Sequence, residues 1–300
     1  MSEAVLVSDT ATDGVAEFRR RGVWRTVRRR PLFWIPLVFL AVLLVLAIVP
    51  GVVAGIFGHG DPRACNISNS AQPPSAGHPF GLDLQGCDVY ANVIYGARAS
   101  LTVGLTCTVI ALGLGMIIGT LAGYFGGWID GLLARVTDVF LGFPFLLGAI
   151  VVLNSLGQRS VWTVALVLAL FSWPTMARLV RSSVRATRDA DYVQAALAMG
   201  FRTRRVILRY LIPNTLGPVL AIATLTVGGV IVAESTLTFL GLGLRSPSIS
   251  WGLQLATAQS RFQQAPHTLI SPAVFLAVTV LSLITLGDVL RDAVNPKGRT

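Results

Sequence analysis

The sequence predicts an all-α membrane protein with six transmembrane helices, and its composition and its hydropathy pattern both favour that fold class. Hydrophobic residues make up 53% of the 300 residues and charged residues only 13%, about half of the share that a soluble domain carries. The mean hydropathy is +0.69. The apolar residues gather in uncharged runs close to the ~20 residues that span a bilayer as a helix, without the period-two alternation of a transmembrane barrel.

Six uncharged runs are expected to be the spans, and together they divide the chain. They cover residues 32–57, 99–125, 139–154, 161–177, 210–233 and 268–287. The expected parts are a tail of residues 1–31, the first span at 32–57, an outer loop at 58–98, a core at 99–290 and a tail at 291–300. The core contains an inner segment at 178–214 and a second outer loop at 241–267.

The distribution of basic residues predicts the orientation of the chain. Nineteen of the 24 Arg and Lys residues fall on the side of the N-terminus, and the other five are Arg63, Arg98, Arg159, Arg245 and Arg261. Because basic residues in short loops stay in the cytoplasm, we expect a multi-pass protein of the cell (inner, cytoplasmic) membrane with both termini cytoplasmic. The net charge of +10 does not indicate a nucleic-acid partner, because no folded polar domain is expected to present a basic surface.

Both outer loops are longer than a membrane turn requires, so each is expected to be either a lid over the helix ends or a docking surface. The first loop contains Cys65 and Cys87, whereas Cys107 falls within the apolar second span. Disulfides persist in compartments outside the cytoplasm. We therefore expect a disulfide between Cys65 and Cys87, with two free thiols as the alternative.

The inner segment contains a short helix pattern from Asp191 to Gly200. Its N-terminus is acidic, which suits the helix dipole, and Gly200 is a typical C-terminal cap. The small residues Ala195 and Ala196 would let a partner's surface approach closely. An interfacial helix lying on anionic lipid would explain the neighbouring arginines equally well, and composition leaves both interpretations open.

The stretch from Asp191 to Asn214 resembles the EAA coupling loop of ABC importer permeases. Gln194, Ala195 and Ala196 stand at the Glu-Ala-Ala positions, followed by Gly200 and by Pro213 in the terminal signature, and Gln194 departs from the family's glutamate. Further matches resemble the dipeptide/oligopeptide/nickel group, specifically its C-type (DppC/OppC-like) transmembrane subunit. They are HPFGLD from His78, YGARASL from Tyr95, GYFGGWID from Gly123, AESTLTFLGLG from Ala233 and GDVLRD from Gly287.

The resemblance implies a type I ABC importer permease fold with a cytoplasmic coupling helix, and a path for di- or oligopeptides, with nickel or glutathione as the alternative cargo. It implies a second homologous permease subunit, two ATPase subunits or one fused ATPase, and an extracytoplasmic substrate-binding protein as partners. The residues expected to couple to the ATPase are Asp191, Gln194, Ala195, Ala196, Gly200 and Pro213. The sequence has no Gly-rich loop ending in Gly-Lys-Ser/Thr, so partner subunits are expected to bind ATP and Mg, with no cofactor in this chain.

Charged residues at membrane depth are functional candidates, and Asp138 and Glu234 qualify. Asp138 is expected to be solvated or paired with Arg135. Glu234 and its neighbour Ser235 are candidates for the translocation path or a gate, with a structural pair to an arginine as the alternative for Glu234. One helical face carries Gly115, Gly119, Gly123 and Gly127, a spacing that indicates close helix packing.

Two other function classes, an enzyme and a secondary transporter, fit the sequence less well than a permease. No His or Cys cluster has the spacing of metal ligands and no Ser/His/Asp set is apparent, so neither a catalytic site nor a metal site is expected and an enzyme is disfavoured. A secondary transporter often shows inverted repeats, and the two halves of this sequence show none. Uptake driven by an ion gradient alone would favour the secondary transporter.

Overall fold

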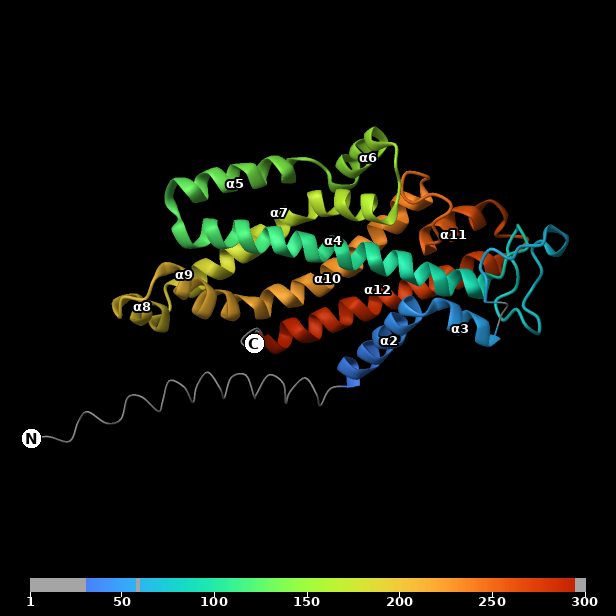
Figure 1. Ribbon diagram of the computed structural model, residues 1–300, viewed down its shortest axis with the longest axis horizontal. Helices are drawn as coiled ribbons and strands as arrows, with labels where there is room; N and C mark the ends of the chain where they lie inside the picture. Colours follow the sequence, from blue (N-terminus) through green and yellow to red (C-terminus); the bar gives the residue numbers. More distant parts are fainter. Residues whose placement is uncertain (1–30, 58–59, 295–300) are drawn as a thin grey trace, which may run out of the picture.

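The computed structural model describes residues 31–57 and 60–294, and this part of the chain is helical. Its α-helices are α2 (Pro31–Ile48), α3 (Pro50–Phe57), α4 (Val89–Phe125), α5 (Gly127–Gly142), α6 (Phe145–Leu156), α7 (Val161–Arg188), α8 (Asp191–Ala198), α9 (Thr203–Val206), α10 (Ile212–Phe239), α11 (Trp251–Ala258) and α12 (Pro266–Val294). Single turns lie at Ile67–Asn69, Ile207–Leu211 and Gln259–Arg261. Figure 1 shows α4, α7, α10 and α12 along the long axis, with α8 and α9 at one end and the first outer loop at the other.

Five helices of the described residues are long and apolar enough to cross a membrane, and a sixth span results if α5 and α6 count as one bent pair. Four of the five contain the predicted runs at 99–125, 161–177, 210–233 and 268–287, and the fifth, Pro31–Ile48, covers the first part of the run at 32–57. Helix α2 ends at Ile48, and α3 completes the first run after a short break. The all-α membrane fold class predicted from composition is therefore confirmed.

The expected third span at 139–154 is wrong as a straight helix. Helices α5 and α6 meet there at an angle of 81°. Between them Phe143 is extended, with φ −87° and ψ 128°, because the ring of the following Pro144 disfavours the helical region for the residue before it. The helix also begins much earlier than expected, at Gly127, because α5 includes charged residues that an uncharged run excludes.

Two other helices extend past the predicted ends for the same reason. Helix α4 begins at Val89, where the Asp88 carboxylate accepts a hydrogen bond from the Tyr90 N–H at 2.9 Å and caps the helix. The first outer loop therefore ends at Asp88 and not at residue 98, and Arg98 is an exposed residue of α4. Helix α7 continues to Arg188, well beyond the predicted end at Ala177.

The glycine face of α4 packs against α7. A Cβ added to Gly119 would lie 2.7 Å from Val180 Cβ, and one on Gly123 would lie 3.0 Å from Val184 Cβ. Gly115 faces Met176 in the same way, so three of the four predicted glycines allow the two helices to approach closely. Gly127 has no neighbour within 4 Å of such an atom, because α4 has already ended at Phe125.

The helix of the fifth span begins before the predicted run at 210–233. Helix α9, a π-helical turn at Ile207–Leu211 and α10 form one continuous membrane-spanning helix, Thr203–Phe239. Pro213 lies inside it, and the missing N–H of proline is tolerated where a π turn already alters the hydrogen-bond pattern. Pro213 is therefore not the boundary between the inner segment and the fifth span.

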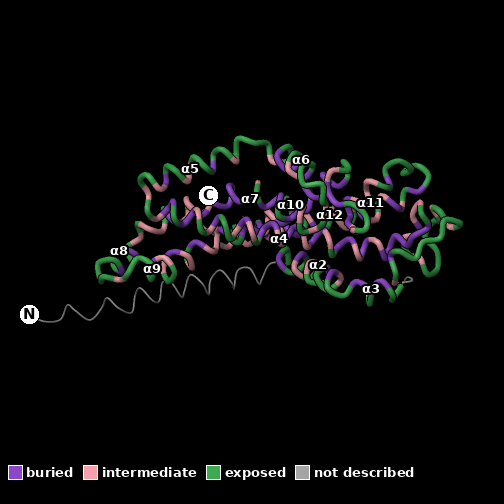
Figure 2. The backbone as a smooth tube through the Cα atoms, turned by 45° about the horizontal axis from the view of Figure 1, so that its top comes forward, coloured by how far each residue is buried: buried purple, intermediate pink, exposed green. Residues whose placement is uncertain are grey.

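Burial is concentrated along the shared axis of the long helices, as Figure 2 shows in purple. Val103, Leu153, Leu168 and Leu237 form part of the largest apolar cluster, where α4, α6, α7 and α10 meet. The outward faces of α2, α5 and α6 remain exposed in this single chain and are rich in large apolar side chains. Such surfaces are stable only against lipid or another apolar protein surface.

Candidate coupling site and outer loops

Helix α8 forms over the predicted stretch, between the end of α7 and the start of α9. Asp191 lies in its first turn, where a negative charge is favoured by the helix dipole. The helix ends before Gly200, whose φ of +77° is a conformation that suits glycine. A side chain at position 200 would therefore strain the backbone, whatever its effect on a partner.

One face of α8 is buried within this chain. Val193 and Ala196 are 0% exposed and pack with Val206 and Leu211 in a cluster below the helix. The prediction that Ala196 lies on the docking face is therefore wrong. Sequence alone could not separate Ala195 from Ala196, because the separation depends on where α9 and the start of α10 pack.

The opposite face of α8 is exposed and partly apolar. Ala195 is exposed, Tyr192 is 45% exposed, and Met199, just past the last turn, is 66% exposed. Tyr192 and Met199 were not among the predicted coupling residues, although their apolar character in an arginine-rich segment is a signal that could have revealed them. An apolar surface on a short helix at one tip of the molecule is typical of a protein contact.

Side-chain hydrogen bonds connect α8 to the ends of α7 and α4. The Gln194 amide Nε2 donates to the carbonyl oxygen of Arg188, the last residue of α7, at 3.1 Å. Arg188 Nη1 in turn donates to the carbonyl oxygen of Tyr124 near the end of α4, at 2.8 Å. Both acceptors are helix-terminal carbonyls that lack a partner within their own helix. Gln194 and Arg188 therefore link α8 to the end of α7, and Arg188 links the end of α7 to the end of α4.

Ion pairs join helix α5 to α7, in addition to the packing of Phe140 against Trp173. The Asp130 carboxylate is bound by both Arg181 and Arg185, and Asp138 pairs with Arg178 at 2.9 Å. Of the two expectations for Asp138, the pair with Arg135 does not form, whereas its side chain is 52% exposed and so is open to solvent in this chain. Arg178, Arg181 and Arg185 recur at spacings of three and four residues, so they share one face of α7, a pattern that was visible in the sequence.

Glu234 is fully buried (0% exposed) between α10 and α4. Its carboxylate accepts hydrogen bonds from Ser100 Oγ of α4 at 3.2 Å, from Ser235 Oγ at 3.3 Å and from Thr238 Oγ1 at 2.9 Å. Within the described part of the chain no arginine pairs with it. Glu234 and Ser235 thus join two helices in this chain, and their assignment to the path or a gate stays a prediction.

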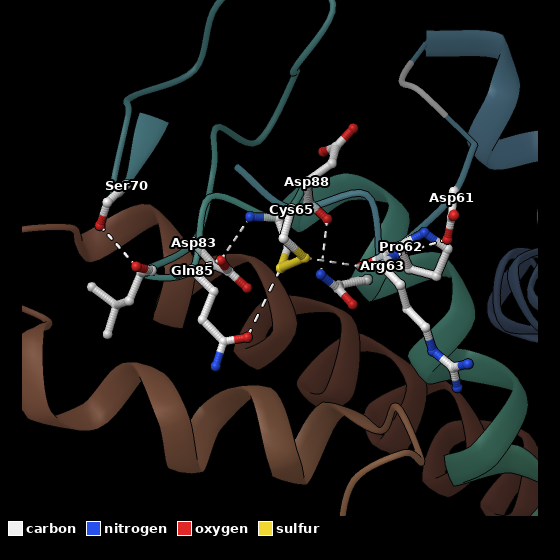
Figure 3. Close-up of a disulfide and its surroundings, with 11 residues drawn as sticks. Asp61, Pro62, Arg63, Cys65, Ser70, Asp83, Gln85 and Asp88 are labelled. Carbon is white, nitrogen blue, oxygen red and sulfur yellow. Dashed lines mark hydrogen bonds between the residues drawn. A yellow bond between two sulfur atoms is a disulfide. The ribbon is translucent and has the colours of Figure 1, made fainter. Parts of the chain in front are cut away.

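Cys65 and Cys87 form a disulfide, the pairing predicted from the sequence, and Cys107 is a buried free thiol. Figure 3 shows the bond beside Asp83, whose carboxylate accepts from the backbone N–H groups of Gln85 at 2.8 Å and Cys87 at 2.9 Å. Burial raises the pKa of Asp83 above its usual range, against the opposing effect of these N–H donors. The disulfide and the hydrogen bonds of Asp83 therefore both constrain this loop, within about twenty residues of chain.

The two outer loops also bind each other. Arg63 Nη2 donates to the carbonyl oxygen of Pro247 in the second loop at 2.9 Å. His267 Nε2, at the start of α12, donates to the carbonyl oxygen of Leu82 at 3.0 Å. The outer end is thus one connected structure, and whether it acts as a lid or as a docking surface stays a prediction. In the described residues, no three His, Cys, Asp or Glu side chains gather as metal ligands would.

Residues 115–300 match a protein family described as the binding-protein-dependent transport system inner membrane component. The chain belongs to this family. The match contains α8, its exposed face and both helices that continue from it. The chain is accordingly a permease subunit of an ABC importer and a component of the inner membrane.

Curated relatives extend the similarity beyond that match. The dipeptide transport system permease protein DppC of Alkalihalophilus pseudofirmus is 36% identical over 277 residues, covering 92% of this chain and 90% of the relative. The oligopeptide transport system permease protein OppC of Bacillus subtilis is 33% identical, covering 86% and 84%. The glutathione transport system permease protein GsiD of Escherichia coli is 35% identical, covering 91% and 89%. The predicted resemblance to DppC/OppC-like permeases is thereby confirmed.

Solved structures agree on the fold. The inward-facing MetNI methionine ABC transporter includes a chain with a TM-score of 0.57 at 18% identity, covering 68% of this chain and 96% of that chain. An amino acid ABC transporter gives a TM-score of 0.53 at 17% identity, covering 67% and 92%. At such identities the likeness extends to the fold alone, and it supports the predicted type I importer permease fold.

Proposed function

We propose that this chain forms one half of a peptide translocation path and passes the work of ATP hydrolysis to it through α8. The carrying observation is the exposed apolar face of α8, joined by Gln194 and Arg188 to the ends of α7 and α4. In this proposal a second homologous permease completes the path. Two ATPase subunits, or one fused ATPase, bind ATP and Mg, and an extracytoplasmic binding protein delivers the substrate.

The coupling step follows from how α8 is held. A groove of the ATPase receives the face that carries Ala195 and Met199, while Val193 and Ala196 fix α8 to the start of the α9–α10 helix. When ATP closes the ATPase pair, α8 moves with its groove and displaces α7 and α10 together. Binding energy between ATPase and α8 that differs between the two states then shifts the permease between inward and outward forms.

Di- or oligopeptides are the proposed cargo. The support is that DppC and OppC, named for dipeptide and oligopeptide transport, align over most of this chain. GsiD, named for glutathione transport, aligns equally far. The alignment with GsiD therefore supports glutathione as the alternative cargo. Nickel is supported only by the family resemblance seen in the sequence.

The orientation is part of the proposal. In Figure 1 α12 ends on the side of the molecule that carries α8, and α2 begins near the middle and runs from there toward the disulfide-bonded loop. This arrangement supports cytoplasmic termini, although both terminal tails fall outside the described residues. A cysteine at Thr300 is expected to resist an impermeant thiol reagent added to intact cells, and labelling from outside would overturn the orientation.

Reconstituted transport tests the function. The chain is co-purified with its partner permease and ATPase subunits, placed in vesicles, and supplied with binding protein and a labelled dipeptide, tripeptide or glutathione. We expect uptake of at least one peptide only with ATP and Mg. Peptide uptake driven by an ion gradient without ATP would contradict the proposal and favour a secondary transporter, and uptake of glutathione alone would replace the cargo.

A further inference from the structure

Four arginines line an open groove at the start of the α9–α10 helix. They are Arg202, Arg204, Arg205 and Arg209, and Leu208 and Pro213 complete the lining. The groove belongs to the first turns of the membrane-spanning helix Thr203–Phe239. The uncharged run of this span begins at residue 210, so we place the groove directly outside the hydrocarbon core, on the side of the lipid headgroups.

The charge in this groove is not neutralised by the protein. In the part of the chain that the structure describes, no carboxylate lies within ion-pair distance of any of the four guanidinium groups. Arg178, Arg181 and Arg185 on α7 differ, since each is bound by an aspartate of α5. The α9–α10 arginines thus leave a local charge of about +4 available to an anion.

The groove borders the packing that supports α8, since Arg205 lies over the ring of Phe201, 4.6 Å from its centroid, and Phe201 packs against that cluster. Val206 and Leu211, from the same helical turns, are buried against α8, whereas the groove is open. Leu208 lies among the arginines and is 54% exposed. The groove thus offers guanidinium groups for a negative headgroup and an exposed leucine for hydrocarbon. A ligand with a negative headgroup attached to a hydrocarbon chain matches both.

We infer that this groove binds the phosphate headgroup of an anionic phospholipid in the cytoplasmic leaflet. The guanidinium groups donate to the phosphate oxygens, for which the planar fork of arginine is well suited, and Leu208 contacts the acyl chains. The assignment of the leaflet rests on the proposed orientation. Bound lipid fixes the depth of the α10 start in the bilayer, and so it provides a fixed point about which α8 can move.

The probe is phosphatidylglycerol, compared with phosphatidylcholine in equal amounts, and the readout is the lipid retained by the purified full-length chain in native mass spectrometry. We expect wild type to retain phosphatidylglycerol preferentially. The double variant Arg205→Gln/Arg209→Gln is expected to lose roughly 10- to 30-fold in that preference. The matched control Arg135→Gln/Arg291→Gln removes two exposed arginines elsewhere and is expected to keep the wild-type preference.

Two further variants keep the inference testable if the glutamine variant does not fold. Arg205→Lys/Arg209→Lys retains the charge and should retain most of the preference, and Leu208→Ser should weaken retention of both lipids without changing their ratio. The inference is overturned if wild type shows no preference, or if the control variant loses as much as the groove variant. It is also overturned if the groove variant keeps its lipid but no longer co-purifies with the ATPase, which would assign the groove to that partner.

Discussion

The two ends of this molecule are stabilised by different means. At the outer end, a disulfide, the Asp83 carboxylate and the bonds from Arg63 to Pro247 and from His267 to Leu82 connect the loops within the chain itself. At the α8 end, a small apolar cluster holds a short helix, and apolar and cationic side chains remain exposed around it.

The difference indicates what each end requires from its surroundings. The outer end is held together by one covalent bond and by hydrogen bonds within the chain. The α8 end exposes Met199 on one side and the four groove arginines on another. These surfaces are stabilised when a protein or a lipid covers them. We therefore expect the ATPase to act on the α8 end, and we expect the outer end to change its conformation less.

The largest expected effect comes from a charge placed under α8. Ala196→Glu would bury a carboxylate against Val206 and Leu211, at a cost of about 3 kcal/mol or more to the local free energy of unfolding. Hydrogen exchange of residues 191–211 should rise strongly, and ATPase association should fall with it.

The matched variant is Ala195→Glu, on the exposed face of the same turn. It should leave hydrogen exchange in this segment unchanged and reduce only the association with the ATPase. Equal exchange in both variants would contradict the assignment of the two faces.

The next largest effect is expected from removing the disulfide. The loss of stability should be confined to the outer end. Cys65→Ser/Cys87→Ser is expected to lower the stability of the loop by about 3 kcal/mol. Faster hydrogen exchange in residues 61–88 would report it, with exchange at 191–211 unchanged as the internal control. Recovery of separate alkylated Cys65 and Cys87 peptides from wild type without reductant would show that the bond does not form.

Asp83 offers a smaller test of the same end. Asp83→Ala removes the acceptor for the Gln85 and Cys87 N–H groups and should cost about 1–3 kcal/mol in local stability. Asp83→Asn keeps an acceptor and removes the buried charge, so it should be neutral or stabilising at neutral pH. Because the folded carboxyl has the raised pKa, the wild-type loop should lose stability as pH rises through that pKa.

The Asn variant should not show this pH dependence, and hydrogen exchange of residues 61–88 between pH 4 and pH 7 would measure it. An identical pH dependence in both proteins would exclude Asp83 as its source.

The smallest effect is expected at Gln194. Gln194→Glu cannot donate to the Arg188 carbonyl, and the exposed site lets water replace the bond, so the loss in stability should be about 0.5 kcal/mol. ATP hydrolysis coupled to transport should stay close to wild type. A severe loss of coupling would show that the amide donor controls the position of α8 more tightly than its exposure suggests.

The sequence predicted what depends on local pattern. Uncharged runs located five of the spans, and the acidic start at Asp191 with Gly200 at the end located α8. The same criterion misplaced helix ends wherever a helix carries charges, at Arg98 in α4 and along α5. Pro144 signalled the break between α5 and α6, but the run from 139 to 154 was extended across it.

Contacts between distant residues could not be predicted. Glu234 accepts from Ser100, 134 positions away, and nothing local to Glu234 distinguishes such a partner from an arginine. Asp138 had Arg135 nearby in sequence and pairs instead with Arg178, because α7 packs against α5. Ala195 and Ala196 are chemically identical, and only the packing of Val206 and Leu211 separates the exposed face of α8 from the buried one.

Site-specific crosslinking measures the central claim, that α8 presents its exposed face to the ATPase. The assembled importer would carry Met199→Cys or Ala196→Cys and be treated with a short bifunctional maleimide, since Cys65 and Cys87 are bonded and Cys107 is buried. Met199→Cys should crosslink to the ATPase, with a yield that changes on ATP addition, and Ala196→Cys should not react. Absence of a crosslink from Met199→Cys in a complex that still hydrolyses ATP would contradict the account.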